Sequence, residues 1–542
     1  MGNSYAPSKY CALTLALRFK IHRYICILVA MQWLNTIVDE LLLRHPEGDV
    51  VVSSGVSPSG TYHLGTLREV LTAEVIAAEV RRRGRTARHL HIVDDLDVLR
   101  KIPVNIDQSF EQYLGMPLCD VPSPDGEAGK SYADYFLQDL LDAVEVMNLK
   151  IETVRAHERY RAGAYVSVIE TALANVETIK TVLREVSGRE LPEDWTPIQV
   201  VDDQGRIKNR LFRSIDTAAQ TVTYIDADES EKQASYADGH VKLSWRVDWP
   251  ARWAMLGIMA EPFGRDHATK GGSYDTGERI VREVYNAEPP YPVPYHFINR
   301  TGETKKMSKS AGNVITAREL LTILPEEIVW YFLIRMSPDK QLFFGEGETL
   351  VRLFDDFAAL QAKTDRSSDE QQLLELCLMH VEQPVVSNVP FSHLVNTYQA
   401  SLRDPALTLR TIQRSEYAKI AAEQAETIRR ELRFIDSWLD RWAPDEVKFA
   451  LTKQIEKDSF NENEVKLFSL LAQKVADAPG GASGEYFHLA LYELRGETGL
   501  EPKEMFSALY RLLIGKSNGP RAGWFLSILP RDWLVDRLML EK

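Results

Sequence analysis

The sequence predicts an α/β protein: a Rossmann-type parallel-sheet domain with an insertion, followed by an all-α C-terminal region. Three observations predict it. A strand–turn–helix–strand pattern begins near residue 49, a polar stretch interrupts the domain at about 105–240, and helical periodicity continues after Thr316. With 542 residues, of which 44% are hydrophobic and 26% charged, the chain is long enough for several ordinary globular domains.

The first strand is expected at 49–56 (DVVVSSGV), a short β-branched run that small residues end. The helix that starts at Leu64 has one apolar face and stops at Gly84. Residues 88–93 (RHLHIV) read as the second strand. Two strands joined by a helix imply parallel pairing with a right-handed crossover. The turn at 57–66 then lies at the carboxyl edge, where such sheets bind ligands.

The rest of the chain gives the domain organisation. Helices are expected at Tyr132–Val146 and Ala164–Val186 within the insertion, and a helix and a late strand follow at Trp249–Met259 and Tyr291–Ile298. A break is expected at 477–484 (DAPGGASG) within the helical C-terminal region. The predicted domains are an extension at 1–30, the Rossmann-type domain at 31–325 with its insertion at about 105–240, and helical regions at 326–395 and 396–542.

Composition sets limits on partners and compartment. The net charge of −14 does not favour nucleic acid as a bulk partner, but a local basic face would still bind one. The four cysteines, Cys11, Cys26, Cys119 and Cys377, lie too far apart in sequence for a paired zinc motif. Their scarcity fits a reducing compartment, so we expect a cytoplasmic protein.

The first 30 residues include an apolar stretch at 10–30 that charged residues interrupt. A membrane-spanning helix needs about 20 apolar residues, and this stretch contains Arg18, Lys20 and Arg23. A signal peptide would want a cleaner apolar core and a small-residue cleavage site. We therefore expect an extension, with Met31 as the alternative start to Met1, and no membrane association.

His63-Leu64-Gly65-Thr66 stands at the start of the first helix. Backbone N–H groups and the positive helix end attract phosphate there, and an imidazole can donate to a phosphate oxygen. Gly65 lets a nucleotide approach the backbone because it has no side chain. Alone, this motif is a weak signal, since such a pattern arises often by chance.

Lys306-Met307-Ser308-Lys309-Ser310 is a stronger signal. Two lysines three residues apart, between Gly302 and Gly312, make a cationic loop that can close on a triphosphate. Lys309 would neutralise the charge that develops on departing pyrophosphate. The alternative, an exposed basic loop without a function, does not explain why five matched residues follow a strand.

The two motifs together resemble those of class I aminoacyl-tRNA synthetases. Longer blocks resemble class I (archaeal-type) lysyl-tRNA synthetases, from about Met31 to the C-terminus. The blocks are SSGVSPSGTYHLGTLREVLTAE at 53–74, HIVDDLDVLRKIP at 91–103, SWRVDWPARW at 244–253, FGRDHATKGGSYDTG at 263–277, KKMSKSAGN at 305–313 and SALYRLLIGKSNGPRAGWFL at 507–526.

This resemblance implies site residues and substrates. Catalysis would involve His63, Lys306 and Lys309. ATP would be bound by His63, Gly65, Thr66, Asp266, His267, Lys306, Ser308 and Lys309. Lysine would be bound by Gly55, Ser57, Asp95, Trp245 and Asp248. Several aspartates at a strand end, close to tryptophans, would suit an ammonium and its methylenes, although each aspartate could equally be a helix cap or surface ion pair.

The implied reaction is activation of L-lysine with ATP and transfer of lysyl to the 3′ end of tRNA(Lys). Mg²⁺ is expected with the triphosphate. No protein metal ligand and no zinc are expected, although some family members carry a zinc-binding cysteine cluster. The helical regions at 326–395 and 396–542 would contact the tRNA stem and the anticodon, and a monomer is expected. Thr66 departs from the usual His or Asn of the motif.

Three alternatives stay open at this point. A glutamyl-type class I synthetase has a related helical region, but glutamate would want Arg or Lys at its end of the site. A non-catalytic tRNA-binding relative would be expected to lack His63, Lys306 or Lys309, and all three are present. A nucleotidyltransferase for small molecules would not need about 200 helical residues after Ser310.

Overall fold

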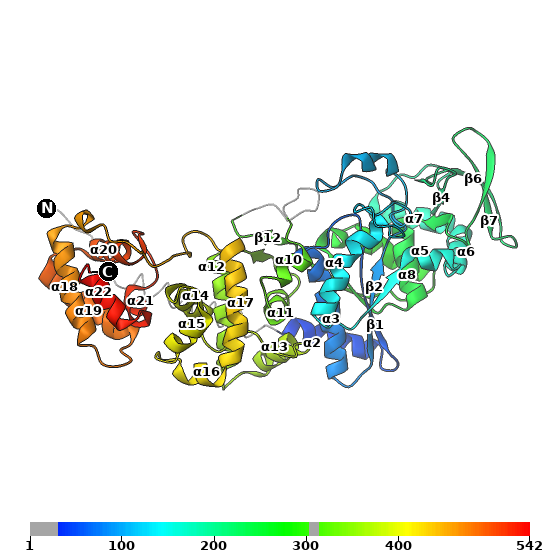
Figure 1. Cartoon of the computed structure of the whole chain (residues 1–542). Helices are drawn as coiled ribbons and strands as arrows, with labels where there is room; N and C mark the ends of the chain where they lie inside the picture. Colours follow the sequence, from blue (N-terminus) through cyan, green and yellow to red (C-terminus); the bar gives the residue numbers. More distant parts are fainter. Residues whose placement is uncertain (1–30, 303–313, 542) are drawn as a thin grey trace, which may run out of the picture. The chain divides into compact units, whose positions relative to one another are not determined.

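The computed structural model describes residues 31–302 and 314–541. They divide into two compact units. The first unit contains residues up to Leu321 together with 329–343 and 367–381; the second contains 322–328, 344–366 and the chain from Glu382 onwards (Figure 1). Residues 367–381 therefore belong with the first unit although they fall in the predicted 326–395 region.

The first unit is built on a five-stranded parallel sheet. Its strands are β1 (Val50–Val56), β2 (Ala87–Val93), β3 (Ile151–Arg155), β10 (Ala260–Gly264) and β11 (Tyr291–Tyr295), in the spatial order β11-β10-β1-β2-β3. This confirms the parallel Rossmann-type sheet and its first βαβ unit. One strand, β3, lies within the range 105–240, so the segment predicted as an insertion also supplies part of the central sheet.

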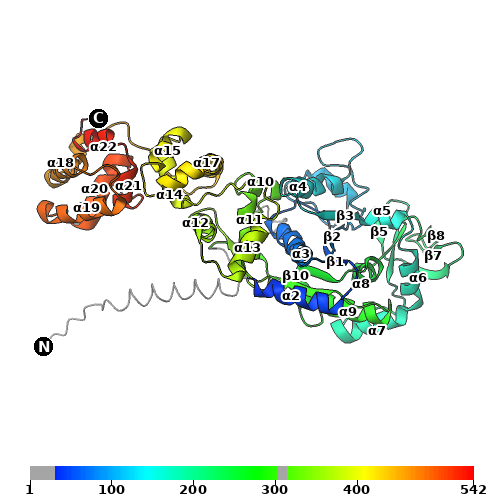
Figure 2. The same cartoon turned by 90° about the horizontal axis from the view of Figure 1, so that it is seen from below.

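Helices cover both faces of this sheet (Figure 2). On one face α3 (Leu64–Arg82) packs against β1 and β2, and its Glu74 bonds His89 of β2. On the other face α8 (Trp245–Leu256) and α9 (Ser273–Glu283) share an apolar core with Leu90, Ile92 and Phe263. Successive β2 residues thus point to opposite faces, as the pleat requires.

The segment between β2 and α8 adds its own small layers. Its elements are η1 (Gln108–Tyr113), α4 (Tyr132–Val146), α5 (Ala156–Arg161), α6 (Val166–Ala174), α7 (Val176–Ser187), β4 (Ile198–Val201), β5 (Ile207–Lys208), β6 (Leu211–Asp216), β7 (Thr221–Ile225), β8 (Glu231–Ser235) and β9 (Val241–Leu243). The short strands form two antiparallel sheets, β5-β4-β9 and β6-β7-β8.

The helix predicted at Tyr132–Val146 is confirmed as α4. The single helix predicted at Ala164–Val186 is wrong, because the chain breaks at Asn175 between α6 and α7. The Asn175 amide donates to the carbonyl oxygen of Thr171 at 2.8 Å. Asparagine side chains compete with the backbone for such hydrogen bonds, which makes them poor residues for a helix interior.

The remaining elements lead out of the sheet and into the helical region. They are α2 (Gln32–Arg44), η2 (Arg265–Ala268), β12 (Ile298–Arg300), α10 (Ala317–Leu321), α11 (Glu326–Ile334), β13 (Leu342–Phe344) and α13 (Ser368–Leu378). The strand predicted at Tyr291–Ile298 is confirmed in its first five residues as β11, after which Ile298 begins β12.

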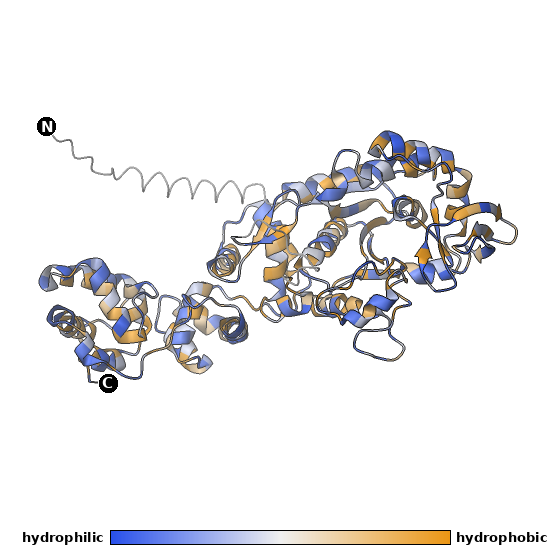
Figure 3. Cartoon of the chain, turned by 90° about the horizontal axis from the view of Figure 1, so that it is seen from above, coloured by the Kyte–Doolittle hydropathy of each residue, from blue (hydrophilic) through white to orange (hydrophobic). Residues whose placement is uncertain are grey.

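The second unit is almost wholly helical, as predicted. Its helices are α12 (Glu348–Ala362), α14 (Phe391–Ala400), α15 (Pro405–Ile412), α16 (Ala418–Glu423), α17 (Ala425–Arg441), α18 (Glu462–Ala476), α19 (Gly484–Thr498), α20 (Pro502–Ile514), α21 (Ala522–Ile528) and α22 (Arg531–Leu538), with η4 at Lys457–Ser459. Hydrophilic and hydrophobic residues alternate along them (Figure 3). The break predicted at 477–484 is confirmed as the α18–α19 connection.

Candidate active site

The strand order of the sheet marks where a ligand binds. From β1 the chain proceeds outwards through β2 to β3, whereas β10 and β11 lie on the other side of β1. Crossovers to opposite sides leave a crevice beyond the carboxyl ends of β1 and β10, the position at which open α/β sheets bind ligands. The residues after β1 include His63, and those directly after β10 form η2, which contains Asp266 and His267.

His63 is the N-cap residue of α3. Its Nδ1 accepts the Gly65 N–H at 2.9 Å, which fixes the imidazole at the first turn of the helix. A Cβ on residue 65 would lie 2.7 Å from the imidazole Cε1. Gly65 is therefore needed for the cap itself, in addition to any close approach of a phosphate. Thr66 lies in the same turn and is buried, with its N–H donated to the His63 carbonyl at 2.8 Å.

A short segment from much later in the chain pairs with this turn. Thr316 forms an antiparallel bridge with His63, the Leu64 N–H donates to the Ile315 carbonyl at 3.2 Å, and the Ala317 N–H donates to the Tyr62 carbonyl at 3.1 Å. These residues follow the Lys306–Ser310 motif within a few positions. Lys306, Ser308 and Lys309 themselves lie outside the described residues, but the described chain returns beside His63 soon after them.

Three aromatic rings form a wall on the far side of the crevice. Trp245 and Trp249 come from α8 and His267 from η2. The His267 ring centroid lies 5.6 Å from that of Trp245 and 5.7 Å from that of Trp249, and the two indoles are 6.0 Å apart. Burial lowers the pKa of His267, which keeps its imidazole neutral. Trp245 is 39% exposed, so part of its ring remains accessible.

The other predicted residues at the crevice lie close to the ends of their strands. Gly55 is in β1, where a Cβ would meet the Ile92 carbonyl oxygen at 3.2 Å. Ser57 donates its hydroxyl to Asp97 at 3.0 Å. Asp266 is exposed in η2.

The acidic side chains at the end of β2 already have cationic partners. Asp95 is fully buried and accepts from Arg155 Nε at 2.5 Å, from His157 Nδ1 at 2.7 Å and from the His157 N–H at 2.8 Å. Three donors on one carboxylate leave it little capacity for a substrate ammonium. Its geometry favours a structural role, and lysine binding by Asp95 stays a prediction.

Asp248 is also a buried carboxylate that is paired with an arginine. Asp248 pairs with Arg252 four residues later on α8 and accepts from the Tyr160 hydroxyl, while Arg252 also pairs with Asp94 at 3.0 Å. Burial alone would raise the pKa of Asp94, but the neighbouring cations Arg252, Lys242 and Arg100 together lower it. One guanidinium is therefore shared between two buried aspartates.

A glutamate that the sequence reasoning missed lies at the end of β1. Glu69, on α3, accepts the Gly55 N–H on Oε1 at 2.8 Å and the Tyr295 hydroxyl on Oε2 at 2.6 Å. The Tyr295 oxygen comes from β11, so the carboxyl group ties together three elements around the crevice. Glu69 is six residues after His63 on a helix, and nothing local in the sequence marks it as facing the site.

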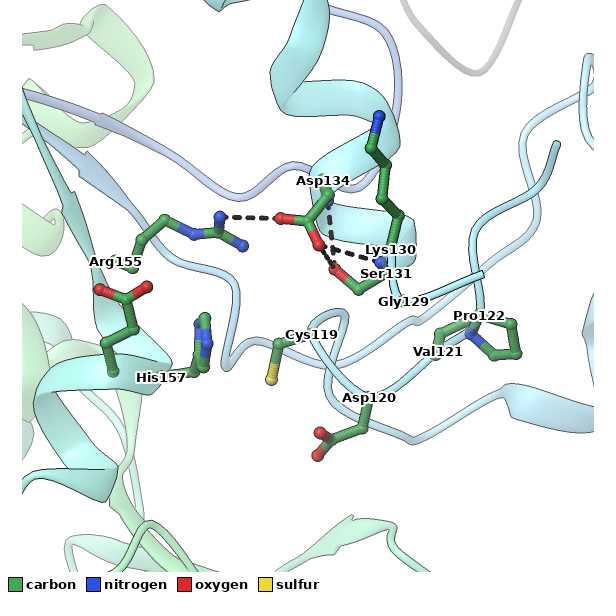
Figure 4. Close-up of a pocket in the computed structure, with 11 residues that line it drawn as sticks. Cys119, Asp120, Val121, Pro122, Gly129, Lys130, Ser131, Asp134, Arg155 and His157 are labelled. Carbon is green, nitrogen blue, oxygen red and sulfur yellow. Dashed lines mark hydrogen bonds and ion pairs between the residues drawn. The ribbon is translucent and has the colours of Figure 1, made fainter. Parts of the chain in front are cut away.

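A separate polar cavity of about 410 Å³ opens beside β3 (Figure 4). It is lined by Cys119, Asp120, Val121, Pro122, Gly129, Lys130, Ser131, Asp134, Arg155, His157 and Glu158. Arg155 donates to Asp134 at 2.8 Å and holds Asp95 on its other side, and Arg161 pairs with Asp120 at 2.6 Å. The charges around this cavity thus largely satisfy one another.

Two general searches concern the described residues only. None of the helices in residues 31–302 and 314–541 is long and apolar enough to cross a membrane. Within the same ranges, three or more His, Cys, Asp or Glu side chains are nowhere grouped so that they could hold a metal ion.

A Rossmann-type crevice at which the His63 turn meets the chain leaving Lys306–Ser310 is the arrangement of a class I aminoacyl-tRNA synthetase. Comparison with known proteins agrees. Residues 31–384 match the family model described as tRNA synthetases class I (K), and the chain belongs to that family.

Similar proteins extend the likeness over nearly the whole length. Lysine–tRNA ligase 1 of Methanosarcina acetivorans is 35% identical over 535 residues, which cover 94% of this chain and 98% of that protein. The lysine–tRNA ligase of Archaeoglobus fulgidus is 36% identical over 509 residues, which cover 94% of this chain and 99% of that protein. A solved glutamate–tRNA synthetase from Elizabethkingia anophelis is 14% identical to this chain, with a TM-score of 0.40. The match covers 91% of this chain and 100% of that one.

Proposed function

We propose that this chain is a class I lysine–tRNA ligase, which activates L-lysine with ATP and transfers lysyl to the 3′ end of tRNA(Lys). The observation that carries the proposal is the pairing of residues 315–317 with the His63 turn, because these residues follow the second ATP motif within a few positions of the chain and lie at the switch point of the sheet. The names of the relatives, similar over at least 94% of the chain, support lysine as the amino acid.

In the first step a lysine carboxylate oxygen attacks the α-phosphorus of ATP. The new P–O bond forms lysyl-adenylate as the bond to the β-phosphate oxygen breaks and pyrophosphate leaves. The His63 imidazole and the N-terminal N–H groups of α3 would hold the phosphates. Lys306, Ser308 and Lys309 would close over them, and Lys309 would neutralise the departing pyrophosphate. We expect Mg²⁺ to arrive with ATP and no protein zinc site.

In the second step a ribose hydroxyl of the terminal adenosine of tRNA attacks the adenylate carbonyl. The acyl–phosphate bond breaks, lysyl-tRNA forms and AMP leaves. No covalent enzyme intermediate is needed, since both steps depend on positioning and charge neutralisation. The helical regions at 326–395 and 396–542 would contact the tRNA stem and anticodon.

We propose Glu69 as the carboxylate that reads the lysine ammonium. An ammonium removed from water needs a paired negative charge. Asp95 and Asp248 pair with Arg155 and Arg252 and each accepts a further hydrogen bond. Glu69 lies at the end of β1, where the Gly55 N–H and the Tyr295 hydroxyl fix the orientation of its carboxyl group. Gly55, Ser57 and Trp245 would then line the methylenes and the α-end of the substrate, and Asp266 and His267 the adenosine.

Amino-acid-dependent pyrophosphate exchange, run with and without tRNA, tests this proposal. Each of the twenty amino acids is offered separately with ATP and labelled pyrophosphate. Lysine is expected to support label exchange, and glutamate is expected to give only background. Exchange that responds to glutamate and not to lysine would replace the proposal by a glutamyl-type activity.

A further inference from the structure

A buried carboxyl group on the sheet is hydrogen-bonded to one ring of the aromatic wall. Glu261, on β10, is 6% exposed and has no ion pair within 4.0 Å among the described residues. Its Oε2 accepts the indole N–H of Trp249 at 3.1 Å and that of Trp253 at 2.5 Å. Burial raises the pKa of Glu261 to about 7. A buried acid without a cation is costly, so packing alone does not explain its presence.

The two indoles that Glu261 holds lie beside each other, with ring centroids 4.8 Å apart, but they differ in their further neighbours. Trp253 is 1% exposed and its ring lies 5.6 Å from Tyr274, within the apolar core between the sheet and α9. Trp249 is half-buried and reaches outwards, with its ring beside those of Trp245 and His267. Trp249 is thus the link between the core and the two rings that we propose to meet lysine and adenosine.

An indole N–H buried without an acceptor loses a hydrogen bond that water would otherwise supply. Trp249 therefore keeps the ring orientation that satisfies Glu261, and this orientation fixes where Trp245 and His267 can pack. From this geometry we infer that Glu261 is a positioning residue: it holds the Trp249 indole and so places the Trp245 and His267 rings for lysine and ATP. The inference rests on the proposed function.

A matched pair of substitutions separates this role from core packing. Trp249→Phe and Trp253→Phe make the same chemical change and each removes one N–H from the same carboxyl oxygen. KM for lysine, KM for ATP and kcat are measured in tRNA charging, together with Tm. Trp249→Phe is expected to raise both KM values about tenfold with kcat within about threefold. Trp253→Phe is expected to lower Tm and leave both KM values within about twofold.

Substitution of Glu261 itself gives the second measurement. Glu261→Gln keeps a carbonyl oxygen for the indole and is expected to retain both KM values within about twofold. Glu261→Leu removes the acceptor and is expected to match Trp249→Phe. If Glu261→Leu does not fold, the two tryptophan variants still decide the matter.

The outcomes of these measurements distinguish a failure of the positioning role from a failure of the proposed function. Equal KM values in the wild type and Trp249→Phe, with lysine charged normally by both, would overturn the positioning role alone. Equal KM increases in Trp249→Phe and Trp253→Phe would show a general packing effect and overturn it as well. A wild-type chain that activates no amino acid would overturn the proposed function and this inference together.

Discussion

The two compact units bury carboxyl groups by different means. In the first unit Asp95 is paired with Arg155, and Asp94 and Asp248 share Arg252. In the second unit two buried glutamates accept backbone N–H groups from residues 385–387 and have no ion pair within 4.0 Å among the residues that the structure describes. Glu327 accepts from Val385 at 2.6 Å and from Val386 at 2.9 Å, and Glu431 accepts from Ser387 at 2.8 Å.

The difference has consequences for charge. Arg252, with Lys242 and Arg100, lowers the pKa of Asp94 against the effect of burial. For Glu431, burial raises the pKa to about 8, so this group binds a proton near neutrality. The edge of the sheet therefore contains carboxyl groups that are paired with arginines, while the helical unit contains Glu431, a buried acid that accepts a hydrogen bond from the backbone.

Removal of Arg252 is expected to have the largest effect. Arg252→Met would leave Asp94 and Asp248 buried without their shared cation. Breaking a buried ion pair in this way costs about 3–5 kcal/mol. Urea unfolding at neutral pH measures the loss of stability. A loss below about 1 kcal/mol would show that the two aspartates do not depend on the arginine.

Removal of the charge on Glu69 is expected to weaken lysine binding. Glu69→Gln keeps the size of the side chain but lacks the negative charge for the ammonium. A hydrogen bond to a charged group is worth about 1.5–3 kcal/mol, so KM for lysine should rise roughly 10- to 150-fold while KM for ATP stays nearly constant. Glu152→Gln is the matched control, since it makes the same chemical change at an exposed ion pair, where Glu152 lies 2.6 Å from Arg88. An equal rise in both variants would contradict the assignment of Glu69.

The stability of the second unit is expected to depend on Glu431 and pH. The folded pKa of about 8 lies above the ordinary value of 4.5, so the stabilisation is complete below about pH 4.5 and is lost as pH rises through 8. Glu431→Gln does not titrate and should gain stability relative to the wild type over this window, on the order of 2 kcal/mol. Thermal unfolding at pH 5, 7 and 9 measures it. A difference that does not grow with pH would contradict the neutral state.

An exposed ion pair of the first unit is expected to have the smallest effect. Arg88 pairs with Glu152 at 2.6 Å, and both side chains are about half exposed. Such pairs contribute about 0–1 kcal/mol. Arg88→Met should therefore change the free energy of unfolding by less than about 1 kcal/mol, and added salt should reduce the change further. A loss as large as that of Arg252→Met would mean that burial does not govern these pairs.

Local patterns in the sequence predicted most of the elements around the site. The β1–α3–β2 unit, α4, and the break between α18 and α19 follow from periodicity and turn residues over a few positions. The place of β3 in the central sheet was not predicted, because its five residues, IETVR, are largely polar and include no run of buried residues. Only its pairing with β2 marks it as part of the sheet.

In the candidate site, too, some features follow from local sequence and others from contacts between distant residues. The two ATP motifs, the class of fold that carries them, and His63 at the start of a helix could all be predicted from the sequence, since each depends on neighbouring residues. The partners of the carboxyl groups could not be predicted in this way and are set by the fold. Asp95 meets Arg155 across 60 positions, and Glu69 meets Tyr295 across 226. Such pairings arise when strands distant in the chain end at one edge of a sheet, and no local pattern encodes them.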